Sequence, residues 1–111
     1  MIKNAVIESA TLDSGDRAHG VLSSWIYVDY GGSGQGFGGW SLYLPGNSSH
    51  RNLMSSAGHW IYRCMEIAGV DSWDEMPGKT IRVALENDLI VGIGHIVKDD
   101  WFYPKKDFAN E

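Results

Sequence analysis

Alternating apolar and polar residues predict the strands of this chain. The stretch 21–30 is rich in β-branched and aromatic residues, which is typical of a strand. Shorter alternating stretches predict further strands at 4–12, 40–44, 80–86 and 89–97. Within 21–30, one face carries Leu22, Ile26, Val28 and Tyr30, and the other carries Ser23, Trp25, Tyr27 and Asp29.

Turn-forming residues separate the predicted strands. The segment 15–20 (GDRAHG) is typical of a turn, and Asn87-Asp88 suits a tight hairpin. Strict alternation through 89–97 predicts one apolar face made of Leu89, Val91, Ile93, His95 and Val97.

Apolar residues at spacings of three and four predict one main helix. They are Met54, Ala57, Trp60, Ile61, Cys64, Met65 and Ala68. Gly69 is suited to end this helix in the left-handed conformation, with Val70 folding back on it. Ser72 and Glu75 form a capping-box pattern, which predicts one short helical turn before Pro77.

The order of these elements predicts the fold class. Strands lie on both sides of a helix and a short helical turn, which predicts an α+β fold. In this fold one main helix and one short helix pack on an antiparallel β-sheet. The 111 residues fit a single domain spanning 1–111.

Charge and cysteine content exclude several classes of protein. The net charge of −5 argues against a general binder of DNA or RNA, which needs a basic face. A single cysteine excludes an intramolecular disulfide and a cysteine-rich zinc site. No apolar run is long enough to span a bilayer, and no signal peptide precedes the first strand. We therefore expect a soluble cytosolic protein without a membrane partner.

A glycine-rich stretch, GGSGQGFGGW at 31–40, contains the G-x-G-x-x-G pattern of dinucleotide sites. A Rossmann turn needs a helix after it, but a strand-like segment follows here, which argues against a dinucleotide fold. Two alternatives remain. The stretch is a glycine-rich bulge or wide hairpin connection, or its free backbone N–H groups from Gly34 to Gly39 contact a phosphate beside Gln35 and Phe37.

Several further residues have a functional and a structural interpretation. Arg63 and Arg82 either clamp a phosphate or are surface-paired arginines. His95 is either a hydrogen-bonded buried histidine or a pocket wall, and its neighbours Gly92 and Gly94 indicate that something approaches this strand closely. The N-terminus of the predicted helix either binds an anion or is simply capped by its own polar residues, which are Asn52, Ser55 and Ser56. The aromatic residues of the tail either form a stacking wall for a ligand or tie down the C-terminus; they are Trp101, Phe102 and Tyr103.

No catalytic arrangement emerges from the residue spacing. The four histidines have no metal-binding spacing, and Cys64 belongs to the apolar stripe of the helix, as expected for an inert buried thiol. These absences favour binding over catalysis.

Long segments of the chain resemble a known family. NAVIESATL, HGVLSSWIYVDYGGSGQGFGGWSLYL, YRCMEIAGV, SWDEMPGKTIRV and GIGHIVKDDWFYP together are similar to the Thoeris anti-defence 1 family of bacteriophages. The resemblance runs from about Asn4 to Phe108, and its most specific pieces are GQGFGG and IGH-x-x-x-D-x-W-F.

The resemblance implies a nucleotide sponge in the cytoplasm of the infected host. Such a protein sequesters cyclic ADP-ribose isomers made by bacterial immune systems, without cleaving them and without a resident cofactor. Members form homodimers or hexamers, and some also bind cyclic oligonucleotides. Combining the family's motif stretches with the chemistry of the ligand, we expect contacts from Gln35, Gly36, Phe37, Gly38, Ser56, His59, Arg63, Arg82, His95, Asp99, Trp101 and Phe102.

Two alternatives stay open beside the sponge. One is a protein-binding inhibitor of a bacterial defence effector. The other is a small phosphodiesterase that uses His59 or His95 as its general base.

Overall fold

The computed structural model describes residues 1–16, 18, 20–43 and 56–108. These residues form one antiparallel sheet with a long and a short α-helix, which confirms the predicted α+β fold. In chain order the elements are β1 (Ile2–Asp16), β2 (Val21–Tyr30), β3 (Ser33–Gly38), β4 (Leu42–Tyr43), α1 (Ser56–Ala68), the 3₁₀ turn η2 (Trp73–Glu75), β5 (Thr80–Glu86), β6 (Leu89–Gly94), β7 (Trp101–Phe102) and α2 (Pro104–Asp107).

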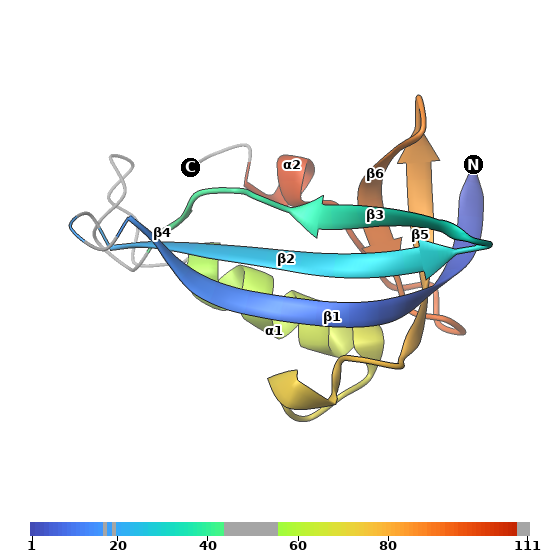
Figure 1. Ribbon diagram of the computed structural model, residues 1–111, viewed down its shortest axis with the longest axis horizontal. Coiled ribbons are helices and arrows are strands. Elements are labelled where there is room, and N and C mark those ends of the chain that lie inside the picture. The colour runs from blue at the N-terminus through green and yellow to red at the C-terminus, as the bar shows by residue number, and fades with distance from the viewer. Residues whose placement is uncertain (17, 19, 44–55, 109–111) are drawn as a thin grey trace.

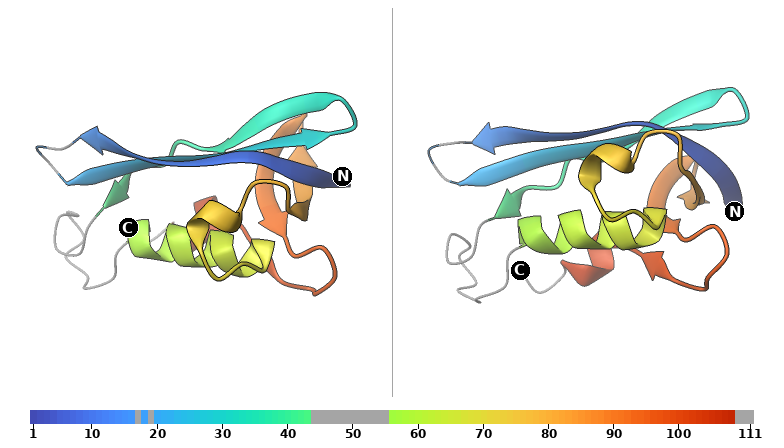
Figure 2. Two further views of the ribbon diagram at one scale, coloured as in Figure 1. Left: turned by 60° about the horizontal axis from the view of Figure 1, so that its bottom comes forward. Right: turned by 90° about the horizontal axis from the view of Figure 1, so that it is seen from below.

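The strands follow the order β3-β2-β1-β5-β6-β7 in the sheet, and β4 pairs with the free part of β2. Figure 1 shows β1, β2 and β3 running along the long axis of the molecule, while β5 and β6 cross it at one end. Helix α1 lies along one face of the long strands (Figure 2). The buried side chains of the long strands, such as Ile7, Ile26 and Val28, belong to the core on this face.

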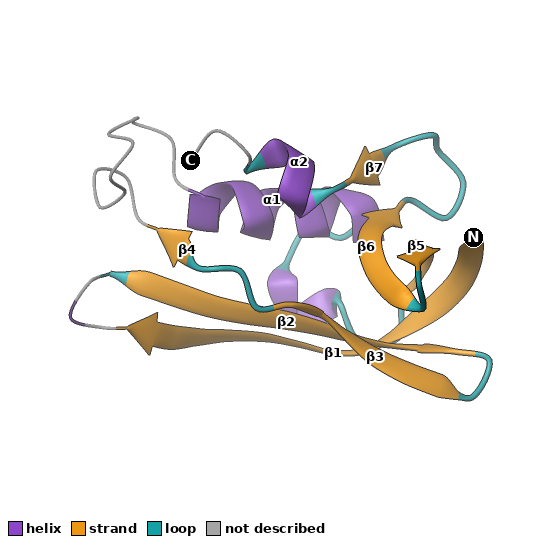
Figure 3. Ribbon diagram, turned by 90° about the horizontal axis from the view of Figure 1, so that it is seen from above, coloured by secondary structure: helices purple, strands orange, loops and turns teal. Residues whose placement is uncertain are grey.

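The core fills the space between α1 and the sheet. Trp60, Cys64 and Ile67 of α1 are buried against Ile26 and Val28 of β2 and their neighbours. Figure 3 shows the short helix α2 and strand β7 closing the same side beside α1. Trp60 is fully buried, and its indole N–H donates to the hydroxyl of Ser24, which is also buried.

The sheet curves until β3 reaches the β5–β6 hairpin, and one side chain joins them. The Gln35 carboxamide donates to the Asp88 carbonyl at 3.0 Å and accepts from the Ile90 N–H at 2.7 Å. It also donates to the Tyr30 hydroxyl at 2.8 Å. These three bonds use the polar atoms that the sequence suggested for a ligand.

The predicted hairpin turn at Asn87-Asp88 and the predicted helix stop at Gly69 are confirmed. Asn87 and Asp88 both have positive φ, as a two-residue hairpin requires. Gly69 has φ +71°, and its N–H and that of Val70 donate to the Met65 carbonyl, which ends α1. The short turn after Ser72 is also present, but the predicted capping box is wrong. The Ser72 hydroxyl donates to the Asp74 carboxylate and caps no backbone N–H.

Several strand boundaries differ from the predictions. Strand β1 continues to Asp16, so the expected turn at 15–20 begins later. The stretch 31–40 is neither a bulge nor an open loop, because 33–38 form strand β3 after a tight turn at Gly31-Gly32. Two predicted helix residues, Met54 and Ser55, and the capping candidate Asn52 lie outside the described residues.

Strand β6 corrects the predicted face of 89–97. Ala84 pairs with Gly92 but Leu85 pairs with Ile90, so Val91 is an extra bulged residue. The alternation reverses there: Ile90 and Ile93 are buried, whereas Leu89 is 64% exposed. The strand ends at Gly94, which leaves His95 in the following loop.

Candidate ligand-binding site

Two aromatic rings lie on the outer face of β6. Trp101 and Tyr103 flank the buried Phe102, so both point away from the core, and their ring centroids are 6.1 Å apart at an interplanar angle of 25°. A methyl group at Gly94 would come within 2.6 Å of the Trp101 ring, and one at Gly92 within 2.5 Å of the Tyr103 ring. The glycines therefore let the rings lie directly against the strand. We call Trp101 and Tyr103 the aromatic platform.

The close approach predicted at Gly92 and Gly94 is thus confirmed, and the approaching groups are rings of the same chain. Both rings are half-buried. Phe102 differs from its neighbours, because it is fully buried against Trp60 and Phe37. Of the three aromatics expected to form a stacking wall or to tie down the tail, Trp101 and Tyr103 form the platform and Phe102 anchors the tail.

Arg82 lies beside the platform. It pairs with Gly94 across β5 and β6, and its guanidinium carbon is 4.8 Å from the centroid of the Trp101 ring. Its Nε donates to the His95 carbonyl and its Nη2 to the Lys98 carbonyl, both at 2.7 Å. Among the described residues, no carboxylate lies within ion-pair distance of Arg82. Arg82 is thus a fixed, partly exposed cation with unused N–H groups.

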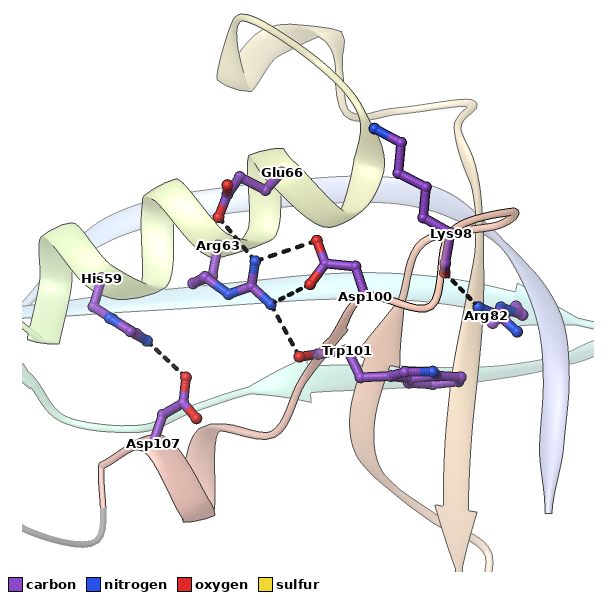
Figure 4. A network of polar contacts seen from close by, with 8 residues as sticks. All are labelled: His59, Arg63, Glu66, Arg82, Lys98, Asp100, Trp101 and Asp107. Carbon is purple, nitrogen blue, oxygen red and sulfur yellow. Dashed lines mark hydrogen bonds and ion pairs between the residues drawn. The ribbon is translucent and has the colours of Figure 1, made fainter.

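Arg63 occupies a different environment. Its guanidinium binds Asp100 at 2.9 Å and Glu66 at 2.8 Å, and it also donates to the Trp101 carbonyl at 2.9 Å (Figure 4). The hydrogen bond to Asp100 raises the pKa of Arg63, and the same bond lowers the pKa of Asp100. Because two carboxylates already balance its charge, Arg63 positions the platform from behind and is a poor candidate for a phosphate clamp.

The 95–100 loop connects β6 to the platform. His95 donates its backbone N–H to the Asp100 carbonyl at 2.9 Å, and its Nδ1 accepts from the N–H groups of Val97 and Lys98 at 3.1 and 3.0 Å. The interpretation of His95 as a hydrogen-bonded residue is therefore confirmed, although it is only partly buried. Asp99 is exposed in the same loop.

The glycine-rich segment is built differently from the expected phosphate loop. Strand β3 pairs with β2 along its whole length, so successive N–H groups do not converge on one point. Phe37 is 1% exposed and packs on Trp60, so it offers no stacking face to a ligand. Replacing it with alanine is expected to destabilise the fold by about 3–5 kcal/mol. Gly36 and Gly38 instead leave room for β2.

A second pair of rings covers this glycine strand. Trp25 and Tyr27 have centroids 6.1 Å apart at 21°, and a methyl group at Gly36 would come within 3.0 Å of the Trp25 ring. The pattern W-x-Y opposite G-x-G therefore occurs twice, as 25–27 against 36–38 and as 101–103 beside 92–94. No described cation lies over the ring of Trp25 or Tyr27, whereas Arg82 lies over Trp101.

The remaining candidates serve structural contacts. The buried Ser56 hydroxyl accepts from the Tyr43 N–H at 2.7 Å, so it joins the described start of α1 to β4. His59 binds Asp107 at 2.8 Å and joins α1 to α2. Cys64 is fully buried, and burial raises the pKa of its thiol, which confirms the interpretation as an inert core residue.

The structure thus brings together only part of the predicted site. Arg82, His95 and Trp101 meet at the β6–β7 end of the sheet, with Arg63 behind them. Gln35 contacts β6 at Ile90, four residues and roughly 13 Å along the strand from Gly94. The predicted ligand-binding set omitted Tyr103, Lys98 and Asp100, although the repeated W-x-Y and G-x-G patterns could have indicated Tyr103.

Two features are absent from the described residues. They contain no group of three or more histidine, cysteine, aspartate or glutamate side chains that could hold a metal ion. None of their helices is long and apolar enough to cross a membrane.

Comparison of the chain with protein-family models, with curated proteins and with solved structures finds no match.

Proposed function

We propose that this chain is a phage anti-defence sponge. It would bind cyclic ADP-ribose isomers in the cytoplasm of the infected cell and hold them intact. One observation carries the proposal: Arg82 is a fixed cation without a described carboxylate partner, and it lies 4.8 Å from a half-exposed aromatic platform. Arg82 lies in the segment SWDEMPGKTIRV and Trp101 in GIGHIVKDDWFYP, and both segments resemble the Thoeris anti-defence 1 family.

The unused N–H groups of Arg82 suit a diphosphate. A guanidinium presents donors in a planar fork that matches phosphate oxygens, and charge-assisted bonds of this kind are worth about 1.5–3 kcal/mol each. The chain as a whole is acidic, with net charge −5, so attraction of an anion must come from a local cation. Lys98 gives Arg82 only its backbone carbonyl, and its side chain extends away from the guanidinium (Figure 4), so Arg82 is the cation that the proposal uses.

The platform suits the adenine of the same ligand. Stacking of a base on an aromatic side chain contributes roughly 1–3 kcal/mol. Trp101 and Tyr103 lie side by side against β6, so each keeps a fixed orientation at little entropic cost. Enclosure between two copies of the chain would strengthen both interactions by excluding water, and we include a homodimer or hexamer in the proposal.

Binding without cleavage is the form of the proposal that the described residues support. Cys64 is buried with a raised pKa, and His59 is bound to Asp107 on the other side of the tail. Nδ1 of His95 accepts two backbone N–H groups. None of these groups is both free and adjacent to Arg82.

A capture-and-release assay tests the proposal. The protein, in molar excess, is incubated with each cyclic ADP-ribose isomer, and free ligand is measured by mass spectrometry before and after heat denaturation. We expect depletion before heating and recovery of the intact isomer afterwards. Recovery of a hydrolysed product would identify an enzyme, and no depletion of any isomer would refute the sponge.

Two charge variants make the assay specific to the site. Arg82→Ala removes the cation beside Trp101, and Lys79→Ala removes one exposed charge at the start of β5. Capture should fall in the first and persist in the second. Because Arg82 also donates two bonds to the 95–100 loop, we expect a modest loss of melting temperature in Arg82→Ala, which thermal unfolding must record in parallel.

A protein-binding inhibitor is the second candidate. The outer face of β1 and β2 exposes Val6 and Tyr27, which are 43% and 42% accessible, beside half-buried Trp25. Aromatic side chains of this kind are enriched in protein interfaces. A defence effector captured by wild-type protein but lost with Tyr27→Ser, in the absence of nucleotide, would favour this candidate.

A further inference from the structure

We propose that the neutral imidazole of His95 is the positioning group that holds the 95–100 loop and thereby keeps the platform beside Arg82. Protonation of this ring would free the loop and let the platform and Arg82 move apart. The inference concerns the loop itself, and its consequence for ligand capture rests on the proposed function.

The hydrogen bonds of His95 define its protonation state. Backbone N–H groups can only donate, and those of Val97 and Lys98 both point at Nδ1, at 3.1 and 3.0 Å. Nδ1 must therefore be unprotonated, and the ring proton of the neutral form must lie on Nε2. The Nε2 side faces the end of α1, where a methyl group on Gly69 would lie 3.6 Å from it.

The bonds to Nδ1 fix the same peptide segment that holds Arg82. Arg82 donates to the carbonyls of His95 and Lys98, while the imidazole accepts from the N–H groups of Val97 and Lys98. The loop is closed at its base by the bond from the His95 N–H to the Asp100 carbonyl. Arg82 and the imidazole are thus two ends of one clasp around the 95–100 loop.

These hydrogen bonds hold a loop that has little buried apolar surface to keep it in place. Val97 is 82% exposed and Ile96 is 36% exposed, so little apolar burial keeps the tip in place. Trp101 follows directly after the loop, and its ring contacts both Gly94 and Arg82. A change in the loop is therefore transmitted to the platform through its covalent connection and through Arg82.

Protonation of Nδ1 would remove both acceptor interactions at once. The added proton would face the N–H groups of Val97 and Lys98, so two hydrogen bonds would be replaced by repulsion between donors. The charged groups around the ring are Arg82 from β5, Lys98 and Asp100 of the loop, and Arg63 of α1, which binds Asp100.

Nuclear magnetic resonance of ¹⁵N-labelled protein tests the clasp without any ligand. The His95 ring and the amides of Val97 and Lys98 are followed from about pH 7.5 to about pH 5, the range in which an imidazole gains its proton. We expect the Nε2-protonated form at the upper end. The two amides should then shift and lose exchange protection with the same midpoint as the ring.

Two substitutions separate positioning from folding. An asparagine side chain can accept from N–H groups two and three residues ahead but does not titrate in this range, so His95→Asn should keep both amides protected at every pH. His95→Ala should leave them unprotected throughout, while the amides of β2 stay unchanged in both variants. The proposal would be overturned if the shifts and exchange protection of the two amides did not follow the titration of the ring. It would also be overturned if His95→Asn left the amides as unprotected as His95→Ala does.

Titration of the wild type with a cyclic ADP-ribose isomer tests the consequence for capture. We expect binding about tenfold weaker at pH 5.5 than at pH 7.5, and less than a twofold change for His95→Asn. Equal pH dependence in the two proteins would refute the link between the clasp and capture. Absence of binding at every pH would refute the proposed function, while the amide data would still decide on the clasp.

Discussion

The contact between Gly94 and Trp101 gives the sharpest prediction for stability. Alanine at position 94 would place its methyl group 2.6 Å from the Trp101 ring, at atoms near the centre of the indole. Since Gly94 does not have a positive φ, alanine meets no backbone strain, and the effect is purely steric. The ring must tilt off the strand and away from Arg82.

The magnitude follows from the cost of overpacking. Such insertions destabilise by about 1–3 kcal/mol. For a chain of 111 residues the unfolding entropy is roughly 0.23 kcal/mol per kelvin, so the melting temperature should fall by about 4–13 °C. The platform should also lose ligand affinity, because its orientation changes.

Gly34→Ala is the matched control for Gly94→Ala. Gly34 also lies in a strand without a positive φ, but its nearest neighbour would be the Val28 carbonyl at an ordinary 3.7 Å. Alanine there should be neutral, or stabilising by up to about 1 kcal/mol. Both variants are compared by thermal unfolding followed by circular dichroism. Equal melting temperatures for the two variants would refute the steric account of the platform.

Three further predictions concern other parts of the molecule. Because Arg63 lowers the pKa of Asp100, ionised Asp100 stabilises the fold above its unfolded pKa of about 4, and this contribution disappears as pH falls through the lower folded value. In urea unfolding, Asp100→Asn should therefore be less stable than wild type at pH 7, and the difference should shrink steadily as pH falls below about 4; a constant difference would contradict this. Gln35→Ala removes the acceptor of the Ile90 N–H and should cost about 1–3 kcal/mol in the same assay, and an unchanged stability would show that packing alone joins β3 to the hairpin. Buried Cys64 should react with a thiol reagent only as the protein unfolds, and rapid reaction of the native protein would contradict its burial.

Much of the fold could be predicted because alternation and helical periodicity are local signals. The strand at 21–30, the hairpin at Asn87-Asp88 and the stop at Gly69 depend on residues close together in the sequence. The bulge at Val91 could not be predicted, since one inserted residue reverses the faces of a strand and leaves no compositional mark.

The candidate site was harder to predict because it depends on strand register. Phe37 lies opposite Ile26 and therefore faces the core, but glycines on both sides of it hide which face is apolar. The two predicted arginines could not be told apart by sequence, since the partners of Arg63 include Asp100, which lies 37 residues away. In the structure two carboxylates neutralise the charge of Arg63, whereas no carboxylate among the described residues lies within ion-pair distance of Arg82.

The central claim is that the platform beside Arg82 captures the ligand, and the two W-x-Y pairs allow a direct test. Calorimetric titration of a cyclic ADP-ribose isomer into Trp101→Ala and Trp25→Ala compares two tryptophans that lie against glycine strands in the same way. Loss of the stacking contact between one base and Trp101 predicts binding about 5–150-fold weaker in Trp101→Ala, and Trp25→Ala should keep wild-type affinity. Equal affinities in these two variants, or no binding by the wild type, would contradict the account.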